Sequence, residues 1–490
     1  VSVLYWPLDG PIHLIAKAIM LRRSRLWRFP PRGLPPIPGA TPPRLSTTAI
    51  AATLKEKRWK IDMWGYDLVW PESGPHPNGG AVTVAAEGLK FAFNAWMFVR
   101  SAAYFGTPHP RVLRSVSTTQ PSMDIALRGN RIFHMHCGTG VGAPPPAELA
   151  RTVALCPAGP DVHCIERFDF ARFAAAQQGE GDRPRLQILV GHENGLSPEL
   201  SDACGARVTL PQYGSVGSLS MNNALGVALA RATAAVCDGD TDVPPPPESL
   251  STNVPVTAPR SVLSSNPFNM NAEGNARPHV DALLDLPDHV VASHLEERRA
   301  LLPLQLGVAW DNLNADRNIG ATVRSANAYN CNHFTVVGRR KFSRRGTLGT
   351  HNYTPMHLVS DWDTALASAA LEGHELWALW NDCPYVLDHL GAGDAAPDEY
   401  REELRTAGRW LCCDRSQELI AAVQGVKAAG GRGVTLVVPE EGCSHRAEVW
   451  GRCHRVLALR STTAATQKGI APAVAATVAL ERLRFASLFA

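Results

Sequence analysis

The sequence predicts an α/β protein with two successive domains, each built on a parallel sheet covered by helices on both faces. Three observations support this prediction. At 490 residues the chain is too long for one ordinary hydrophobic core. Short β-type runs alternate with helical patterns in both halves, which is typical of parallel sheets. The two halves also match each other in sequence, which indicates a tandem duplication.

Composition places the domain boundaries. Residues 1–75 form a basic, Pro-rich N-terminal extension, and residues 76–236 form the first domain. Residues 237–284 contain VPPPPES and SSNPFNMNAEGNARP, which hold few large apolar side chains and many turn formers. Such a segment does not bury enough apolar surface to fold, so we predict a disordered linker. Residues 285–490 form the second domain.

The regular elements are predicted from residue type and periodicity. Runs rich in Val, Ile, Leu and Trp and four to eight residues long indicate buried strands, whereas longer alanine-rich runs indicate helices. The predicted strands are 82–86, 131–135 and 186–191 in the first domain and 306–310, 333–338, 375–380 and 434–438 in the second. The predicted helices are 222–236 and 473–483.

Two ungapped alignments relate the domains. Val84–Gly106 (VAAEGLKFAFNAWMFVRSAAYFG) and Val308–Asn330 (VAWDNLNADRNIGATVRSANAYN) are identical at eight positions. Further along, ILVGHENG from Ile188 aligns with LVVPEEGC from Leu436. The same register sets Arg207–Val208 against Arg455–Val456. Because the two matches occur in the same order, they favour a duplication over chance.

The N-terminal region and the cysteines indicate the cellular compartment of the protein. Residues 1–50 hold seven Lys and Arg, nine prolines and the single acid Asp9, a composition typical of an organelle transit peptide. We therefore expect a mitochondrial matrix location; the alternative is a basic arm that lies on RNA. The eleven cysteines are scattered and form no CxxC pair, which favours a reducing compartment. No apolar run is long enough to span a bilayer, so we predict no membrane partner.

Three segments resemble the three motifs of the SpoU/TrmH family of RNA ribose 2′-O-methyltransferases, in the SPOUT superfamily. They are NADRNIGATVRSA from Asn314, LVGHENGLSPEL from Leu189 and LPQYGSVGSLSMNNALGVALARA from Leu210. The resemblance covers most of both domains, although neither domain carries all three motifs intact. It implies trefoil-knotted domains, a rare exception to the rule against knots, and an intrachain pseudo-dimer in place of the family's dimer.

The resemblance also implies S-adenosylmethionine as cofactor and assigns roles to matching residues. Arg324 and Arg100 match the arginine credited with engaging the ribose hydroxyl or its phosphate, and Asn318 and Asn94 match the asparagine beside it. Since arginine stays protonated, a clamp on phosphate suits it better than general-base chemistry. Glu193 matches the family glutamate of motif two. The residues implied to bind the cofactor are Val190, Gly191, Gly195, Leu210, Pro211, Ser218, Leu219 and Ser220.

The departures from the motifs are complementary. Ser220 replaces the family asparagine of motif three. Motif one of the first domain has bulky side chains such as Trp96, where the second domain has Gly320. Pro439 and Cys443 replace the glycines of motif two in the second domain, and a proline removes a backbone donor. We therefore expect one composite site, in which Glu193 and the 210–220 loop of the first domain bind cofactor and either Arg324 or Arg100 presents the ribose.

Two further clusters lie outside the motifs. Basic side chains interleaved with an aromatic follow the strand 333–338 and suit phosphate contact and base stacking, so we predict RNA binding by Arg339, Arg340, Lys341, Phe342, Arg344 and Arg345. His and Cys residues also gather at 134–137 and 156–164, but their spacing fits no standard zinc site, and we predict no metal.

Two functions from different classes remain open. One is a methyltransferase acting on ribosomal RNA in mitochondrial ribosome biogenesis. The other is a catalytically inactive assembly factor that binds ribosomal RNA. Transfer RNA is a third candidate substrate. The expected partners are ribosomal RNA and an assembly intermediate of the large subunit, and a second SpoU-type protein stays open.

Overall fold

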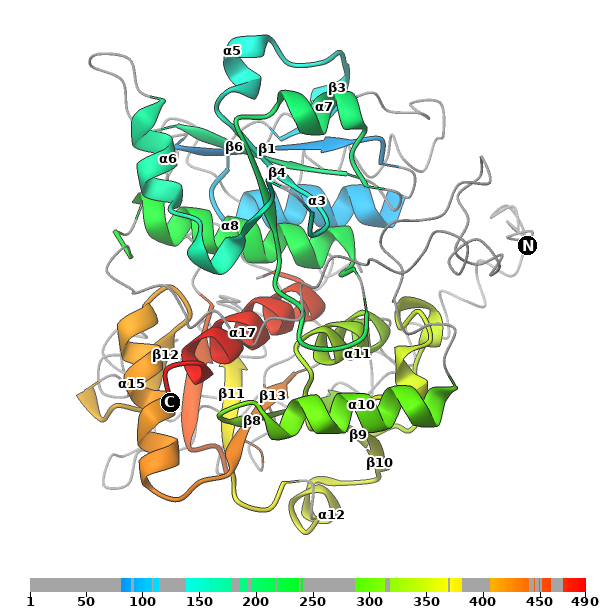
Figure 1. Ribbon diagram of the computed structural model, residues 1–490. Helices are drawn as coiled ribbons and strands as arrows, with labels where there is room; N and C mark the ends of the chain where they lie inside the picture. Colours follow the sequence, from blue (N-terminus) through cyan, green and yellow to red (C-terminus); the bar gives the residue numbers. More distant parts are fainter. Residues whose placement is uncertain are drawn as a thin grey trace, which may run out of the picture.

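In the described residues, the two halves of the chain form two parallel sheets of seven strands each (Figure 1). The structure is a computed structural model that describes residues 81–89, 92–107, 110–113, 138–159, 161–177, 185–191, 195–216, 218–237, 239–240, 287–312, 318–368, 371–380, 406–439, 445, 449, 452–459 and 470–490. The N-terminal extension and most of the predicted linker lie outside this range, as do Glu193 and the predicted strand 131–135.

The first half alternates strands and helices along the chain. Its elements are β1 (Val82–Glu87), α3 (Ala92–Tyr104), β2 (Arg111–Leu113), β3 (Gly138–Val141), α5 (Pro146–Leu149), β4 (Thr152–Leu155), β5 (His163–Cys164), η2 (Ile165–Arg167), α6 (Phe170–Ala176), β6 (Leu186–Val190), α7 (Pro198–Ala203), β7 (Ala206–Thr209) and α8 (Met221–Cys237).

The second half repeats this pattern. Its elements are α10 (Asp288–Ala300), β8 (Gln305–Asn312), α11 (Asn318–Ala328), β9 (His333–Gly338), η4 (Arg344–Gly346), η5 (Thr350–Asn352), β10 (Met356–Val359), α12 (Trp362–Leu366), β11 (His374–Trp380), β12 (Trp410–Cys412), α15 (Ser416–Ala428), β13 (Gly433–Val438), β14 (Arg455–Ala458) and α17 (Pro472–Ser487). Where residues are described, the predicted strands and both predicted helices are confirmed.

The sheet topology supports the duplication. The strand orders are β3-β2-β1-β6-β4-β7-β5 and β10-β9-β8-β13-β11-β14-β12, which are the same order in equivalent strands. The register agrees as well, because Val84 pairs with Ile188 and Val308 pairs with Leu436, the residues that the two alignments equate. Further along, the ladders place Ala206, rather than Arg207, at the position of Arg455, so that part of the alignment was one residue out.

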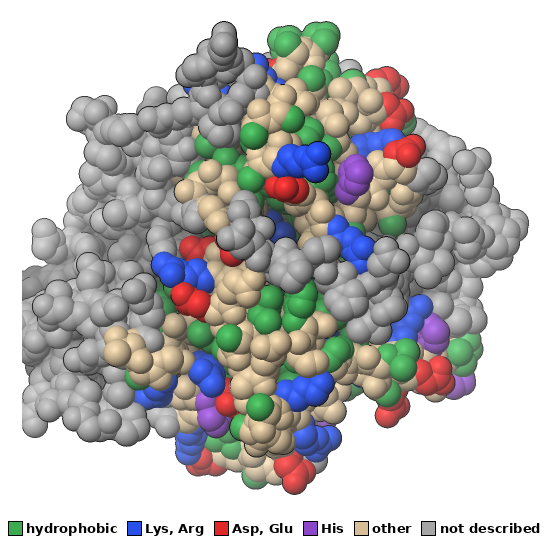
Figure 2. Space-filling view, turned by 60° about the vertical axis from the view of Figure 1, so that its left-hand side comes forward, with side chains coloured by type: hydrophobic (Ala, Val, Ile, Leu, Met, Phe, Trp, Pro, Cys, Tyr) green, Lys and Arg blue, Asp and Glu red, His purple; other side chains and the backbone are tan. Residues whose placement is uncertain are grey.

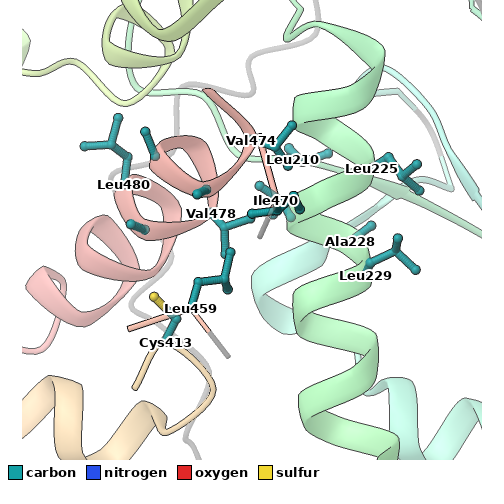
Figure 3. Close-up of a cluster of buried hydrophobic side chains, with 14 of the residues drawn as sticks. Leu210, Leu225, Ala228, Leu229, Cys413, Leu459, Ile470, Val474, Val478 and Leu480 are labelled. Atoms are coloured by element: carbon teal, nitrogen blue, oxygen red, sulfur yellow. The ribbon is translucent and has the colours of Figure 1, made fainter. Parts of the chain in front are cut away.

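The halves meet through their helices. Helices α3 and α8 of the first half face α11 and α17 of the second, between the two sheets (Figure 1). Every residue of α17 from Pro472 to Ser487 is buried, as expected of a helix covered on all sides. Figure 3 shows Val474 and Val478 of α17 on the side of that helix that faces α8, and Leu225 and Leu229 on the opposite side of α8; all four belong to the same cluster of buried apolar side chains. One hydrophobic core therefore runs through both halves.

The crossing of α8 and α17 is close because one partner is glycine. A Cβ on Gly226 would lie 2.2 Å from Cγ1 of Val474. The missing side chain at Gly226 therefore lets the backbone of α8 approach Val474 of α17 closely.

Two predictions remain, the absence of a membrane span and the presence of a knot. No helix among the described residues is long and apolar enough to cross a membrane. The predicted knot depends on how the chain threads between β6 and α8, and residues 192–194 and 217 of that stretch are not described. The knot therefore stays a prediction.

Candidate functional site

Equivalent helices carry the two motif-one segments. Asn318 is buried and is the first residue of α11, and Arg324 lies in the middle of that helix. Their counterparts Asn94 and Arg100 lie on α3, where Arg100 is buried. The segment of the second half that aligns with motif three includes residues 461–469, which are not described. Of the two motif-one arginines, only Arg324 therefore has a described motif-three loop from the other half.

Arg324 reaches the motif-three loop of the other half. Its Nε donates to the carbonyl oxygen of Ser218 at 2.5 Å, and its Nη2 donates to Ser218 Oγ at 2.6 Å. Burial lowers the pKa of Arg324 to about 10, which still leaves it a cation at neutral pH. Within the described residues, Nη1 of Arg324 makes no hydrogen bond, so its N–H groups can donate to a bound anion. Arg324 of the second half therefore contacts the loop of the first half that was predicted to bind cofactor.

The motif-three loop follows β7 and ends at α8. Leu210 and Pro211 are buried at its start, and Ser218, Leu219 and Ser220 are partly exposed at its end. Ser220 Oγ accepts from the backbone N–H of Asn223 at 3.3 Å, so it caps α8. In the middle of the loop, the N–H groups of Tyr213 and Gly214 both donate to the carbonyl oxygen of Ala328 on α11.

Motif two forms a tight turn after β6. Val190 is the last, buried residue of that strand. A Cβ on Gly191 would lie 2.2 Å from the backbone carbon of Gly195, and Gly195 has φ +89°. Both positions therefore require glycine. In the second half proline and cysteine stand at the two aligned positions, and a proline removes a backbone donor.

The segments predicted to bind cofactor lie at one edge of the first sheet. Strands β6 and β7 are parallel neighbours of β4, so the loops after them leave the sheet at the same edge. Open α/β sheets bind ligands at this edge. The described residues fit S-adenosylmethionine in composition, since Val190, Leu210 and Pro211 offer apolar contact to an adenine and Ser218 and Ser220 offer polar groups.

Several polar residues near this site were not predicted. Asn223 Nδ2 donates to Ser325 Oγ at 3.0 Å, and Ser325 Oγ lies 2.7 Å from Thr477 Oγ1. Asn222 Nδ2 donates to Asn94 Oδ1 at 3.5 Å. The only signal in the sequence was that two asparagines follow the motif-three serine. The partner of Asn223, Ser325 on α11, comes from the packing of the two halves, whereas the partner of Asn222, Asn94, lies on α3 of the same half.

The predicted RNA-binding loop sits against α11. Arg339, Arg340, Lys341 and Arg344 are exposed, whereas Phe342 is half-buried against the main core. The side chain of Asn312 donates to the carbonyl oxygens of Arg339 and Lys341. The structure therefore brings the basic loop beside the helix that carries Arg324; the side chain of Arg345 is not described.

Gly320, which stands where the first half has Trp96, makes this contact possible. A Cβ there would lie 2.6 Å from the carbonyl oxygen of Ser343 in the basic loop. The equivalent residue of the first half, Trp96, is buried. On the face drawn in Figure 2, basic side chains are interspersed with acidic ones.

Comparisons with known proteins give similarity over about a third of the chain. No protein-family model matches the chain, and neither does any curated protein sequence. Similar solved structures include an AdoMet-bound rRNA methyltransferase from Sinorhizobium meliloti, with 18% identity over 32% of this chain and 57% of that chain and a TM-score of 0.26. The A. aeolicus TrmH/SpoU tRNA modifying enzyme has 18% identity over 31% of this chain and 74% of that chain, with a TM-score of 0.26. The SpoU methyltransferase AviRb from Streptomyces viridochromogenes, in complex with AdoMet, has 22% identity over 31% of this chain and 59% of that chain, with a TM-score of 0.25.

Proposed function

We propose that the chain is an S-adenosylmethionine-dependent ribose 2′-O-methyltransferase of the SpoU type, with one composite site shared between its halves. The observation that carries this proposal is the pair of hydrogen bonds from Arg324 of the second half to Ser218 of the first. The motif that binds cofactor and the motif that engages the ribose meet there, although 106 residues separate them in sequence.

The chemistry assigned to the protein is positioning. Bound S-adenosylmethionine supplies an electrophilic methyl group on a sulfonium. A ribose hydroxyl is a weak nucleophile, and alignment with the methyl group contributes much of the rate in such reactions. Arg324, fixed through Nε and Nη2, keeps Nη1 to hold a phosphate or orient the 2′-hydroxyl. Because Arg324 keeps its positive charge, we assign it no role in removing the proton of the 2′-hydroxyl.

The substrate of this proposal is ribosomal RNA in a mitochondrion. The exposed basic residues 339–341 and 344 suit phosphate contact, and their loop packs on α11 beside the site. The Arg-rich, acid-poor residues 1–50 support the mitochondrial location. A large-subunit assembly intermediate is the proposed partner, and transfer RNA is the alternative substrate.

A second candidate function is an inactive assembly factor that binds ribosomal RNA. Two sequence departures favour it. Ser220 stands where the family has asparagine, and Pro439 stands at a glycine position of the second half. Under this alternative the basic loop binds RNA while the site transfers no methyl group.

Calorimetry with S-adenosylmethionine on the full chain separates the two functions. The enzyme proposal expects micromolar binding that Gly195→Pro abolishes, because the φ of +89° is closed to proline. Cys443→Pro, at the equivalent position of the second half, is the matched control and should bind normally. No binding by the unmodified chain favours the assembly factor, and equal losses in both variants contradict the composite site.

A transfer assay then tests Arg324. With labelled S-adenosylmethionine and mitochondrial ribosomal RNA, the unmodified chain should form alkali-resistant 2′-O-methyl linkages. Arg324→Lys keeps the charge but cannot make both contacts to Ser218, so transfer should fall by about a hundredfold. Arg415→Lys, on the exposed surface of α15, should leave transfer unchanged.

A further inference from the structure

We propose that α11 of the second half holds the motif-three loop of the first half in its cofactor-binding conformation, with Asn327 as the positioning residue. The inference rests on the proposed function, because that function makes S-adenosylmethionine the ligand of the loop. Under this proposal the second half takes part in cofactor binding, although other residues replace its own motif-two glycines.

The contacts of Asn327 carry this inference. Its Oδ1 accepts from the backbone N–H of Val216 at 2.9 Å and from Ser215 Oγ at 3.1 Å. Asn327 is only 3% exposed, so water does not compete for these bonds. One amide oxygen thus binds two successive residues of a loop that comes from the other half.

The backbone of the same loop lies against the same end of the helix. A Cβ on Gly214 would lie 1.7 Å from the carbonyl oxygen of Asn327, so only glycine fits there. From the other side, Arg298 of α10 donates to the carbonyl oxygen of Gly214 at 3.2 Å. Within the first half, Tyr213 OH donates to both carboxyl oxygens of Glu166.

The position of Asn327 relative to Arg324 links the loop to the reacting groups. The two residues are three apart on α11 and therefore lie on one face of the helix. Arg324 binds Ser218, and Asn327 binds Ser215 and Val216. A single helical turn therefore fixes both the loop and the guanidinium, so a shift of α11 would move the two together.

Amide hydrogen exchange and calorimetry on the full chain test the proposal. Asn327→Leu keeps the size of the side chain but removes the acceptor. We expect exchange at Val216 to rise at least tenfold and the affinity for S-adenosylmethionine to fall at least tenfold. Asn352→Leu, at an exposed asparagine of η5, is the control and should change neither. If Asn327→Leu does not fold, Ser215→Ala removes one of the two bonds and should raise Val216 exchange about threefold.

The outcomes are distinguishable. Unchanged exchange at Val216 in both variants overturns the positioning role, whatever the affinity. Faster exchange with unchanged affinity overturns the link to cofactor binding. If the unmodified chain binds no S-adenosylmethionine, the proposed function and that link both fail, while exchange at Val216 still decides whether Asn327 fixes the loop.

Discussion

A buried carboxyl group at the boundary between the halves predicts a specific pH dependence of stability. Glu166 of η2 accepts hydrogen bonds from Tyr213 OH at 3.2 Å to each carboxyl oxygen. It is buried near Glu481 of α17, whose Oε1 pairs with Arg231 of α8 at 2.5 Å. Two carboxyl groups thus share one close arginine, with the nearby Arg167 contributing less.

The structure fixes the direction and the size of the effect. Burial, and then the charge of Glu481, raise the pKa of Glu166 to about 7 from an ordinary 4.5. The folded chain therefore binds a proton that the unfolded chain has released, and stability declines as the pH rises from about 4.5 past 7. A shift of this size corresponds to about 3 kcal/mol. Glutamine resembles the protonated group, so Glu166→Gln should remove this decline and be more stable than the unmodified chain at pH 8.

Urea denaturation at several values between pH 5 and pH 8 measures this effect. Glu418→Gln on α15 is the control, because that carboxylate is exposed and pairs with Arg415 at the surface. The unmodified chain and the control should lose stability with rising pH, and Glu166→Gln should lose about 3 kcal/mol less over that range. If Glu166→Gln shows the same slope as the other two, Glu166 does not hold the proton and the reasoning fails.

Three further substitutions test the contacts between the halves and the basic loop. Gly214→Ala places a methyl group against the backbone of Asn327 and should lower the urea midpoint by the equivalent of about 3 kcal/mol, whereas Gly425→Ala, in open space, should not. Asp240→Ala removes the carboxylate 3.0 Å from the buried Arg482 and should cost about 3 kcal/mol, measured in the same way; a loss below about 1 kcal/mol contradicts this. Gly320→Trp introduces the residue of the first half and should displace the basic loop, so the affinity for ribosomal RNA should fall about tenfold. A filter-binding assay measures this fall, and the affinity for S-adenosylmethionine is the control.

Much of the fold could be predicted because it is encoded locally. Strands such as 434–438 are continuous apolar runs, and the duplicated motif one marks equivalent helices without any knowledge of packing. The proposal of a composite site also came from the sequence, since the glycines of motif two survive in one half and the open form of motif one survives in the other.

The partners of single polar residues could not be predicted in the same way. In the sequence, Glu481, Arg482 and Arg484 resemble the solvent face of an alanine-rich helix. In the structure all three are buried, because both halves cover α17, and they bind groups as distant in sequence as Arg231 and Asp240. Asn327 escaped notice for the same reason, since a hydrogen bond across 111 residues leaves no periodicity in the chain.

The crossing of Gly226 with Val474 has a consequence for substitutions between the halves. A Cβ at position 226 would lie 2.2 Å from Cγ1 of Val474, so any side chain there would push α8 and α17 apart. Because one cluster of buried apolar side chains includes residues of both helices and both sheets, a change at this single glycine would disturb the packing of both halves.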